Sequence, residues 1–420
     1  MTEIILAYLI IILGTINAIR MSFLFISGDV YDCFWARNKR KFVKKNYRPL
    51  ISIIIAAYNE EKVIKRTLDS IYASKYRNFE VVIVDDGSKD RTGRIVKRFK
   101  NNKLRNLTLV SQENGGKAIA LNNALKNYVK GNLIMTLDAD SVLANDALKK
   151  VIVYFCNPKV VAVASNVKII KQNSLLGIIQ YIEYLLGYRL KKAYTVLNNE
   201  YIIGGIGSTF RKSAIKHVNY YDTDTVTEDI DLTMKIIAKG NKNNKVIYAS
   251  DVICYTEPAM NVSDLFKQRY RWKFGRFQTL YKNVGLFFNR SKIYSKPLTF
   301  LQLPFVIYSE LAFLIDPILV TFIIYLCIKY RETASLLGVF SFLAFYVILA
   351  IVSDEHLSHK ERIYFIIFAP LSYFFFFIIS LVEYAALVKS IIRYKGIIYA
   401  REIGKCGWEH VDRIGSSLSV

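Results

Sequence analysis

The chain has 420 residues, 53% of them hydrophobic, and a formal net charge of +24 at pH 7. This length accommodates one soluble domain and several membrane spans. Part of the positive excess directly follows the first apolar stretch, at Arg37, Lys39, Arg40, Lys41, Lys44 and Lys45. Basic residues in that place favour a cytosolic flank over nucleic-acid binding, so no nucleic acid is expected as a partner. Five scattered cysteines without a Cys-x-x-Cys pair exclude a disulfide framework and a zinc site.

An apolar run over residues 4–27 opens the chain. At about 1.5 Å of rise per residue, roughly 20 residues cross the hydrocarbon core of a bilayer. A signal peptide is the alternative, but basic residues follow the run instead of a small-residue cleavage site. We therefore expect residues 1–30 to form a transmembrane helix in contact with the lipid bilayer. The basic flank places the following residues in the cytosol.

Residues 48–259 have the pattern of an α/β domain. Short apolar runs of strand length alternate with helical patterns. The expected strands are Ile51–Ala57, Phe79–Asp85, Leu107–Ser111, Leu133–Asp138 and Val160–Ala164, and the expected helices are Glu60–Ala73, Lys89–Phe99, Ala118–Tyr128 and Asn145–Phe155. This alternation predicts a largely parallel, buried sheet, which binds ligands beyond the carboxyl ends of its strands.

Acidic residues stand at two of those strand ends. Asp85 and Asp86 close the second strand, and an Asp-x-Asp of Asp138 and Asp140 closes the fourth. In extended backbone the residues i and i+2 point the same way, so Asp138 and Asp140 are expected to face one ligand. Carboxylates are the oxygen ligands that Mg²⁺ and Mn²⁺ prefer. The alternative is a solvated turn before a helix.

A further acidic pair, Glu228 and Asp229, follows Thr227 at the start of a helical pattern that stops at Gly240. Thr227 suits an N-cap, and acids in a first helical turn suit the helix dipole. A transfer reaction also needs a carboxylate base to take a proton from the attacking hydroxyl. Both interpretations stand on the sequence alone.

Residues 260–296 are rich in Arg, Lys and aromatic residues, and they predict amphipathic helices in the membrane interface. Gln268, Arg271 and Trp272 lie there as a Gln-x-x-Arg-Trp stretch. Arg can contact a phosphate and Trp can stack on a sugar ring, whereas locally an ordinary Arg/Trp membrane anchor explains the pair as well.

Residues 297–390 contain three apolar segments, 297–328, 334–352 and 363–388, each long enough to span. Three spans would leave the C-terminus outside, yet the basic residues of 391–420 favour a cytosolic tail. Pro317 and Pro370 are therefore candidate break points, and the number of C-terminal spans stays open.

The motifs Asp86, Asp138-x-Asp140, Thr227-Glu228-Asp229 and Gln268-x-x-Arg271-Trp272, in this order, resemble those of the family 2 membrane glycosyltransferases. This group includes the cellulose, hyaluronan and chitin synthases and, with the most similar layout, the bacterial poly-N-acetylglucosamine synthases. The resemblance covers roughly residues 48–290. It implies an α/β fold, with a cytosolic GT-A-type (Rossmann-like) domain inserted between transmembrane helices. It also implies an inverting, processive transferase that moves a hexose, with N-acetylglucosamine favoured, from a UDP-sugar to a growing polysaccharide and couples transfer to export.

The same resemblance implies roles for individual residues. Asp229, with Glu228 beside it, matches the catalytic base, and Asp140 matches the ligand of a Mg²⁺ or Mn²⁺ ion. The remaining matches are to substrate-binding positions: Tyr58, Glu60, Asp86, Lys117, Asp138, Gly207, Ser208, Gln268, Arg271 and Trp272. Trp408 and Arg413 faintly resemble a further motif of some members. A carbohydrate acceptor and a small membrane accessory subunit are the further partners that the resemblance suggests.

Two other classes of protein fit less well. A non-processive transferase that glycosylates a lipid shares these motifs and differs in the length of its product. A transporter with a nucleotide-binding domain would require a phosphate-binding Gly-x-x-x-x-Gly-Lys loop, and a dinucleotide oxidoreductase would require Gly-x-Gly-x-x-Gly after the first strand; neither pattern is present.

Overall fold

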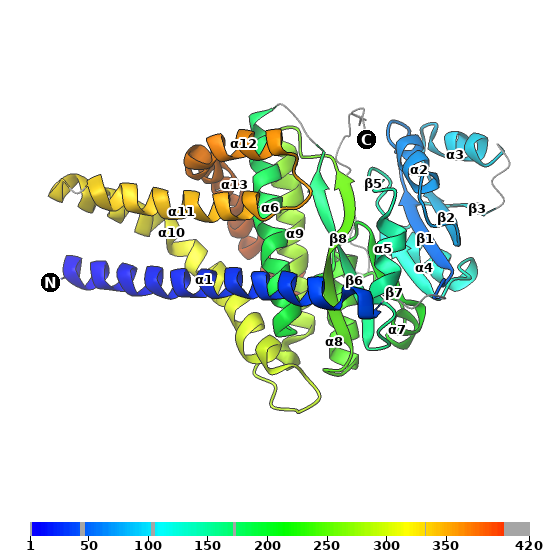
Figure 1. Cartoon of the computed structure of the whole chain (residues 1–420), viewed down its shortest axis with the longest axis horizontal. Helices are drawn as coiled ribbons and strands as arrows, with labels where there is room; N and C mark the ends of the chain where they lie inside the picture. Colours follow the sequence, from blue (N-terminus) through cyan, green and yellow to red (C-terminus); the bar gives the residue numbers. More distant parts are fainter. Residues whose placement is uncertain (1, 43–46, 102–105, 171–173, 332, 399–420) are drawn as a thin grey trace.

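The computed structural model describes residues 2–42, 47–101, 106–170, 174–331 and 333–398. One part is an α/β domain, and long helices project from it on the side opposite to β1 and β2 (Figure 1). Most of the expected tail, with Trp408 and Arg413, lies outside the described residues.

Eight strands form one mixed sheet in the order β3-β2-β1-β4-β7-β6-β8-β5. The strands are β1 (Ile51–Ala57), β2 (Phe79–Asp86), β3 (Leu107–Gln112), β4 (Leu133–Thr136), β5 (Val142–Leu143), β6 (Val160–Ile169), β7 (Ser208–Arg211) and β8 (Lys245–Thr256). β3, β2, β1 and β4 run parallel, and β7 pairs antiparallel with both β4 and β6. The expected parallel half is therefore confirmed, and the second half is mixed.

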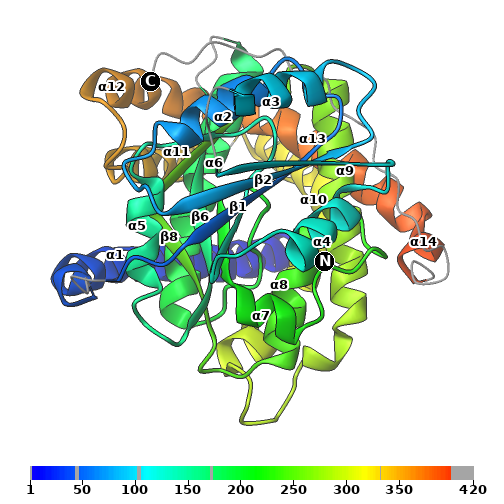
Figure 2. The same ribbon diagram turned by 90° about the vertical axis from the view of Figure 1, so that its right-hand side faces the viewer.

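Helices cover both faces of the sheet, with α2 and α3 on one side and α4, α7 and α8 on the other (Figure 2). The helices of this domain are α2 (Ile64–Tyr72), α3 (Thr92–Asn101), α4 (Lys117–Asn127), α5 (Ala147–Tyr154), α6 (Leu175–Leu197), α7 (Lys212–His217) and α8 (Glu228–Lys239). Alternate residues of β1 divide between two cores: Ile53 packs with Leu68 of α2, whereas Ile54 packs with Leu125 of α4. Two-sided burial explains the continuous apolar runs of the parallel strands.

The strand before the Asp-x-Asp pair is shorter than expected. β4 ends at Thr136, where its pairing with Ile54 ends, and the Ser141 amide donates to the Asp138 carbonyl at 3.1 Å. Asp138 and Asp140 therefore lie in a turn, so the expectation that strand alternation aims both side chains the same way is wrong. Their exposure also differs, because Asp140 is buried and the Asp138 side chain is 31% exposed.

Three helical segments are long and apolar enough to cross a membrane: Ile5–Trp35 within α1 (Thr2–Phe42), Pro297–Tyr330, and Phe374–Ile392. The second comprises a π-helical segment η2 (Pro297–Gln302) and α10 (Leu303–Tyr330), which continues unbroken through Pro317. α11 (Thr333–Val352) contributes a shorter apolar stretch. Pro370 separates α12 (His359–Phe368) from α13 (Ser372–Ile392) through the 3₁₀ turn η3 (Ala369–Leu371).

Helix α9 (Val262–Lys282) joins the α/β domain to these apolar helices; η1 (Val284–Leu286) follows it, and the short α14 (Tyr394–Ile398) packs against it. Three cations recur along one face of α9 at helical spacing, namely Arg269, Lys273 and Arg276. They pair with carboxylates of three other helices. Arg269 lies 2.7 Å from Glu183 of α6, and Lys273 lies 2.8 Å from Glu383 of α13. Lys273 and Arg276 lie 2.9 and 3.2 Å from Glu310 of α10. This largely buried charge network fixes α9 against the apolar helices.

Candidate active site

The loops after β1 and β2 are tied to each other. Tyr58 is half-buried directly beyond β1, and Asn59 turns the chain with a φ of 57°. The Asn59 amide donates to Ser88 Oγ at 3.0 Å, and the Glu60 amide donates to Thr92 Oγ1 at 2.8 Å. The expected nucleotide-cradling residues Tyr58 and Glu60 therefore lie at the carboxyl edge of the sheet, next to the end of β2.

Asp86 ends β2 and is buried. One of its carboxylate oxygens accepts from Gln112 Nε2 at 2.8 Å and from the Gly115 amide at 2.9 Å, and the other accepts from the Gly116 amide at 2.8 Å. Gly116 has a φ of 91° and caps α4. Asp86 thus shapes the glycine loop that leads into Lys117, a structural task that motif matching alone does not suggest.

Lys117, the first residue of α4, lies among the acids of two other segments. Its ammonium is 2.8 Å from Asp138 Oδ1 and 2.7 Å from Glu228 Oε1. Burial alone would lower the pKa of Lys117, but the carboxylates of Asp138, Glu228 and Asp229 outweigh burial and hold that pKa well above its usual value. Residues from three expected motifs therefore meet at one point beyond the sheet.

Asp229 lies in the first turn of α8, where Oδ1 accepts from the Ile230 amide at 2.8 Å. Burial, reinforced by the neighbouring Glu228 carboxylate, raises the pKa of Asp229 to about 6. A carboxylate with a raised pKa is a better proton acceptor than an ordinary aspartate. Thr227 makes no side-chain cap on α8, so the capping interpretation of this triplet is not supported at Thr227.

The loop Gly204–Ser208 approaches the same carboxylates. A methyl group at Gly205 would lie 3.0 Å from Lys117 Nζ and 3.6 Å from Asp229 Oδ2. Gly207 instead faces the sheet, since a methyl group there would lie 2.2 Å from Cys254 Sγ, and the Ser208 hydroxyl donates to the Gly204 carbonyl. Gly205 is thus the loop residue nearest the reactive groups. The glycine pattern of the sequence indicates the loop but does not reveal which glycine faces the site.

We expect Gly205→Ala to lower the transfer rate roughly 10-fold, because the added methyl displaces the Lys117 ammonium from its position beside Asp138. Gly187→Ala in α6 is the matched control, since a methyl there meets no atom within 4 Å. Initial rates and thermal melts of both variants check this prediction. Equal rates for the two variants would contradict it.

The Asp138–Asp140 turn is fixed from α2. Arg66 donates to the Asp140 carbonyl at 2.9 Å and pairs with the buried Glu257 at 2.8 Å, and Thr67 Oγ1 donates to the Ala139 carbonyl at 2.7 Å. Carboxylates are ligands that a divalent cation prefers, and such a cation needs few protein ligands when phosphate oxygens complete its shell. Arg66 and Glu257 were not identified from the sequence, because they act only through this turn.

Gln268, Arg271 and Trp272 lie on α9. The Arg269 guanidinium stacks over the Trp272 ring at 4.6 Å, and among the described residues the buried Gln268 Oε1 has no hydrogen-bond partner. A methyl group at Gly275 of the same helix would lie 2.3 Å from Thr227 Oγ1. This close approach brings α9 against the start of α8, so the fourth motif borders the segment that holds Asp229.

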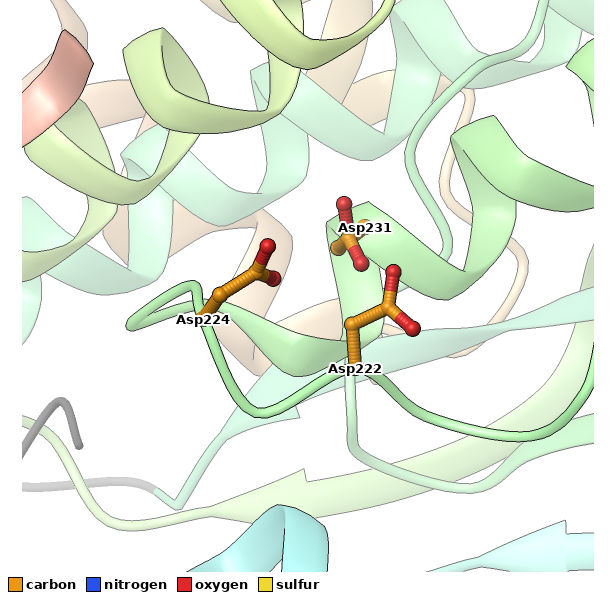
Figure 3. Close-up of side chains that lie close together, drawn as sticks. All are labelled: Asp222, Asp224 and Asp231. Carbon is orange, nitrogen blue, oxygen red and sulfur yellow. The ribbon is translucent and has the colours of Figure 1, made fainter. Parts of the chain in front are cut away.

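A second acidic cluster includes Asp231, two residues after Asp229 in α8. Figure 3 shows Asp222, Asp224 and Asp231 with their carboxylates directed toward one another. Among the described residues these three have the spacing of a metal site, but the Lys282 ammonium lies within 3.1 Å of all three carboxylates. The lysine thus supplies the positive charge that a cation would provide.

The sheet, the acidic turn and the flanking apolar helices define a glycosyltransferase of the GT-A fold. The sequence profile of glycosyl transferase family 2 matches residues 52–218, and the chain belongs to this family. It is 34% identical over 291 residues to poly-β-1,6-N-acetyl-D-glucosamine synthase of Staphylococcus aureus (strain COL), a match that covers 67% of this chain and 68% of the relative. The synthase of Staphylococcus epidermidis is 35% identical over 272 residues, with coverage of 63% and 64%.

Among solved structures, a mannosyltransferase from Pyrobaculum calidifontis in complex with GDP-mannose and Mn²⁺ is similar in fold, with a TM-score of 0.53 and 24% identity. The match covers 80% of this chain and 97% of that one. The chain is therefore a glycosyltransferase, and its apolar helices make it a membrane protein.

Proposed function

We propose that the protein transfers N-acetylglucosamine from UDP-N-acetylglucosamine to the end of a growing polysaccharide, with inversion at the sugar's anomeric carbon. The convergence of Lys117, Asp138, Glu228 and Asp229 beside Gly205 is the observation that most supports it. The similarity to poly-β-1,6-N-acetyl-D-glucosamine synthases supports the choice of sugar and polymer.

In the proposed reaction, Asp229 accepts the proton of the acceptor hydroxyl while that oxygen forms a bond to the anomeric carbon. The bond between that carbon and the diphosphate breaks at the same time, and UDP leaves with the electron pair. Lys117 and Arg271 stabilise the negative charge of the departing diphosphate. A Mg²⁺ or Mn²⁺ ion held by Asp140, with Asp138 beside it, would neutralise further diphosphate charge.

We assign the donor to the edge of the sheet formed by Tyr58, Glu60 and Asp86, and the acceptor end to Gln268 and Trp272 on α9. The loop that contains Gly207 and Ser208 borders this site through Gly205. The unpartnered Gln268 Oε1 supports this assignment, because a buried acceptor atom is stabilised by a ligand hydroxyl.

We further propose that residues 48–259 are the catalytic domain and lie in the cytosol, where UDP-sugars are available. Residues 1–30 and 297–390 form a multi-pass anchor, and 260–296 forms the interface between anchor and domain. The three span-length helices support this arrangement, and the charge network between α9 and the apolar helices supports a close connection between transfer and export.

The test is a product assay. Purified full-length protein in lipid nanodiscs is incubated with UDP-N-acetylglucosamine or another UDP-sugar, with Mg²⁺ or Mn²⁺, and the product is sized. We expect a polymer from UDP-N-acetylglucosamine. Single-sugar lipid products from every UDP-sugar would overturn the polymerase assignment and favour the lipid glycosyltransferase.

Trp272→Ala is expected to reduce polymer formation roughly 5-fold while UDP affinity stays within about twofold, because an aromatic face stabilises the acceptor sugar by about 1 kcal/mol. Trp272→Phe is the matched control, since it keeps an aromatic face beside Arg269. Polymer yield and UDP titration check the pair of variants. A parallel loss of UDP affinity would place Trp272 at the donor instead.

A further inference from the structure

One face of α9 connects two parts of the site. Gln268, Arg271, Gly275, Gln278 and Lys282 recur at alternating spacings of three and four residues, so they lie along one side of the helix. The first two belong to the Gln-x-x-Arg-Trp motif. The last three contact the segment that leads into Glu228 and Asp229.

The three contacts occur on successive turns. At Gly275 the absence of a side chain admits Thr227, and Gln278 Oε1 accepts from the Val226 amide at 3.0 Å. Lys282, the last residue of α9, lies 3.0 Å from Asp222, 2.7 Å from Asp224 and 3.1 Å from Asp231. A single rigid helix therefore contacts the segment both before and after Asp229.

The Lys282 contact is largely removed from water. The Lys282 side chain is 11% exposed and that of Asp231 is fully buried. Lys235, on α8 itself, also pairs with Asp222 at 2.6 Å. Separating a buried ion pair leaves a buried charge uncompensated, which costs more than separating a surface pair. Buried pairs therefore hold the two segments that carry them at a more closely fixed distance.

We propose that Lys282 is a positioning residue: by holding Asp222, Asp224 and Asp231, it fixes the start of α8, and with it Asp229, at a set distance from the acceptor-binding face of α9. This inference rests on the proposed roles of Asp229 and of the Gln268–Trp272 motif. Lys282 touches neither substrate, and its effect reaches the reaction through Asp231, two residues beyond the base.

The placement matters because proton transfer requires the base within hydrogen-bond reach of the acceptor hydroxyl. A displacement of about 1 Å can lower a rate about 100-fold. Thr227 forms no side-chain cap on α8, so these contacts with α9 supply restraint that a local cap does not. The donor side depends on Asp86 and Asp138, which belong to β2 and to the turn after β4.

The test compares Lys282→Met with Lys282→Arg in full-length protein. We expect Lys282→Met to lower kcat at least 10-fold, while UDP affinity stays within about threefold and donor hydrolysis by water falls less than transfer. Lys282→Arg keeps the charge and should recover most of the rate. Lys267→Met is the matched control, because Lys267 lies on the same helix, is 42% exposed and forms an ion pair with the nearby Asp264 at 3.5 Å.

Asp224→Asn provides a milder variant should Lys282→Met fold poorly, since Asp224 is 20% exposed and its loss leaves the Lys282–Asp231 pair intact. It should lower kcat by a smaller factor with unchanged UDP affinity. Unchanged kcat in Lys282→Met would overturn the proposal. So would a fall in kcat accompanied by a fall in UDP affinity of the same factor and by a clear fall in melting temperature. Each rate is compared with the turnover of the wild-type enzyme, so the test of Lys282 remains valid if the product is a glycolipid.

Discussion

Replacing Asp229 by Asn is expected to lower kcat about 10³-fold, the range for removal of a general base. The wild-type enzyme should lose kcat/KM by about tenfold per pH unit below pH 6, because burial and Glu228 raise the pKa of Asp229 to about 6 and only the deprotonated carboxylate accepts the proton. This acid limb should disappear from the residual activity of Asp229→Asn. Rates measured from pH 5 to 8 check both statements.

The stability of Asp229→Asn separates the base from a helix cap. A raised folded-state pKa means that the unfolded chain releases this proton more readily, so the carboxylate destabilises the fold increasingly as pH rises from about 4 to 6, and the penalty is complete above pH 6. An uncharged Asn removes that penalty, so the melting temperature at pH 7.5 should stay equal or rise. A clear fall in melting temperature with a modest loss of rate would favour a purely structural Asp229.

Asp140→Asn is expected to lower turnover at least about 100-fold, corresponding to about 3 kcal/mol of lost transition-state stabilisation. The substitution is nearly isosteric, and the turn retains the bonds from Arg66 and Thr67 to its carbonyls. Binding of Mn²⁺ in the presence of UDP, followed by electron paramagnetic resonance, should weaken in parallel.

Asp69→Asn is the matched control for that variant, since Asp69 is half exposed on α2 and forms a surface ion pair with Lys65. Such surface pairs contribute about 0–1 kcal/mol, so its rate should equal the wild-type rate. Near-normal activity and Mn²⁺ binding in Asp140→Asn would remove Asp140 from the metal site.

The sequence predicted the parallel half of the sheet well, because strands such as β1 and β2 are buried on both faces and appear as unbroken apolar runs. β5, β7 and β8 were missed. β5 and β7 are short, at two and four residues, and β7 depends on pairing with β4 and β6. β8 is longer, and it pairs with β6 and β5 from distant parts of the chain. Pairing between distant segments leaves no local pattern.

At the site, the acids stood out because each follows an apolar strand or opens a helix. What sequence spacing could not provide was their mutual arrangement. The ammonium of Lys117 between Asp138 and Glu228, the orientation of Gly205 and the contacts of Lys282 all join residues at least 20 positions apart. The roles of the named site residues remain predictions that the substitutions above test.

The charge network of α9 bears on how the protein is made. Glu310 and Glu383 belong to helices that are long and apolar enough to cross a bilayer, where an unpaired carboxylate is strongly unfavourable. Their partner Lys273 lies on α9, which precedes both helices in the chain and is therefore synthesised before them. Lys273 is thus already present to pair with Glu310 and Glu383 when their helices are synthesised. We therefore expect the C-terminal helices to be degraded when they are expressed as a separate chain without α9.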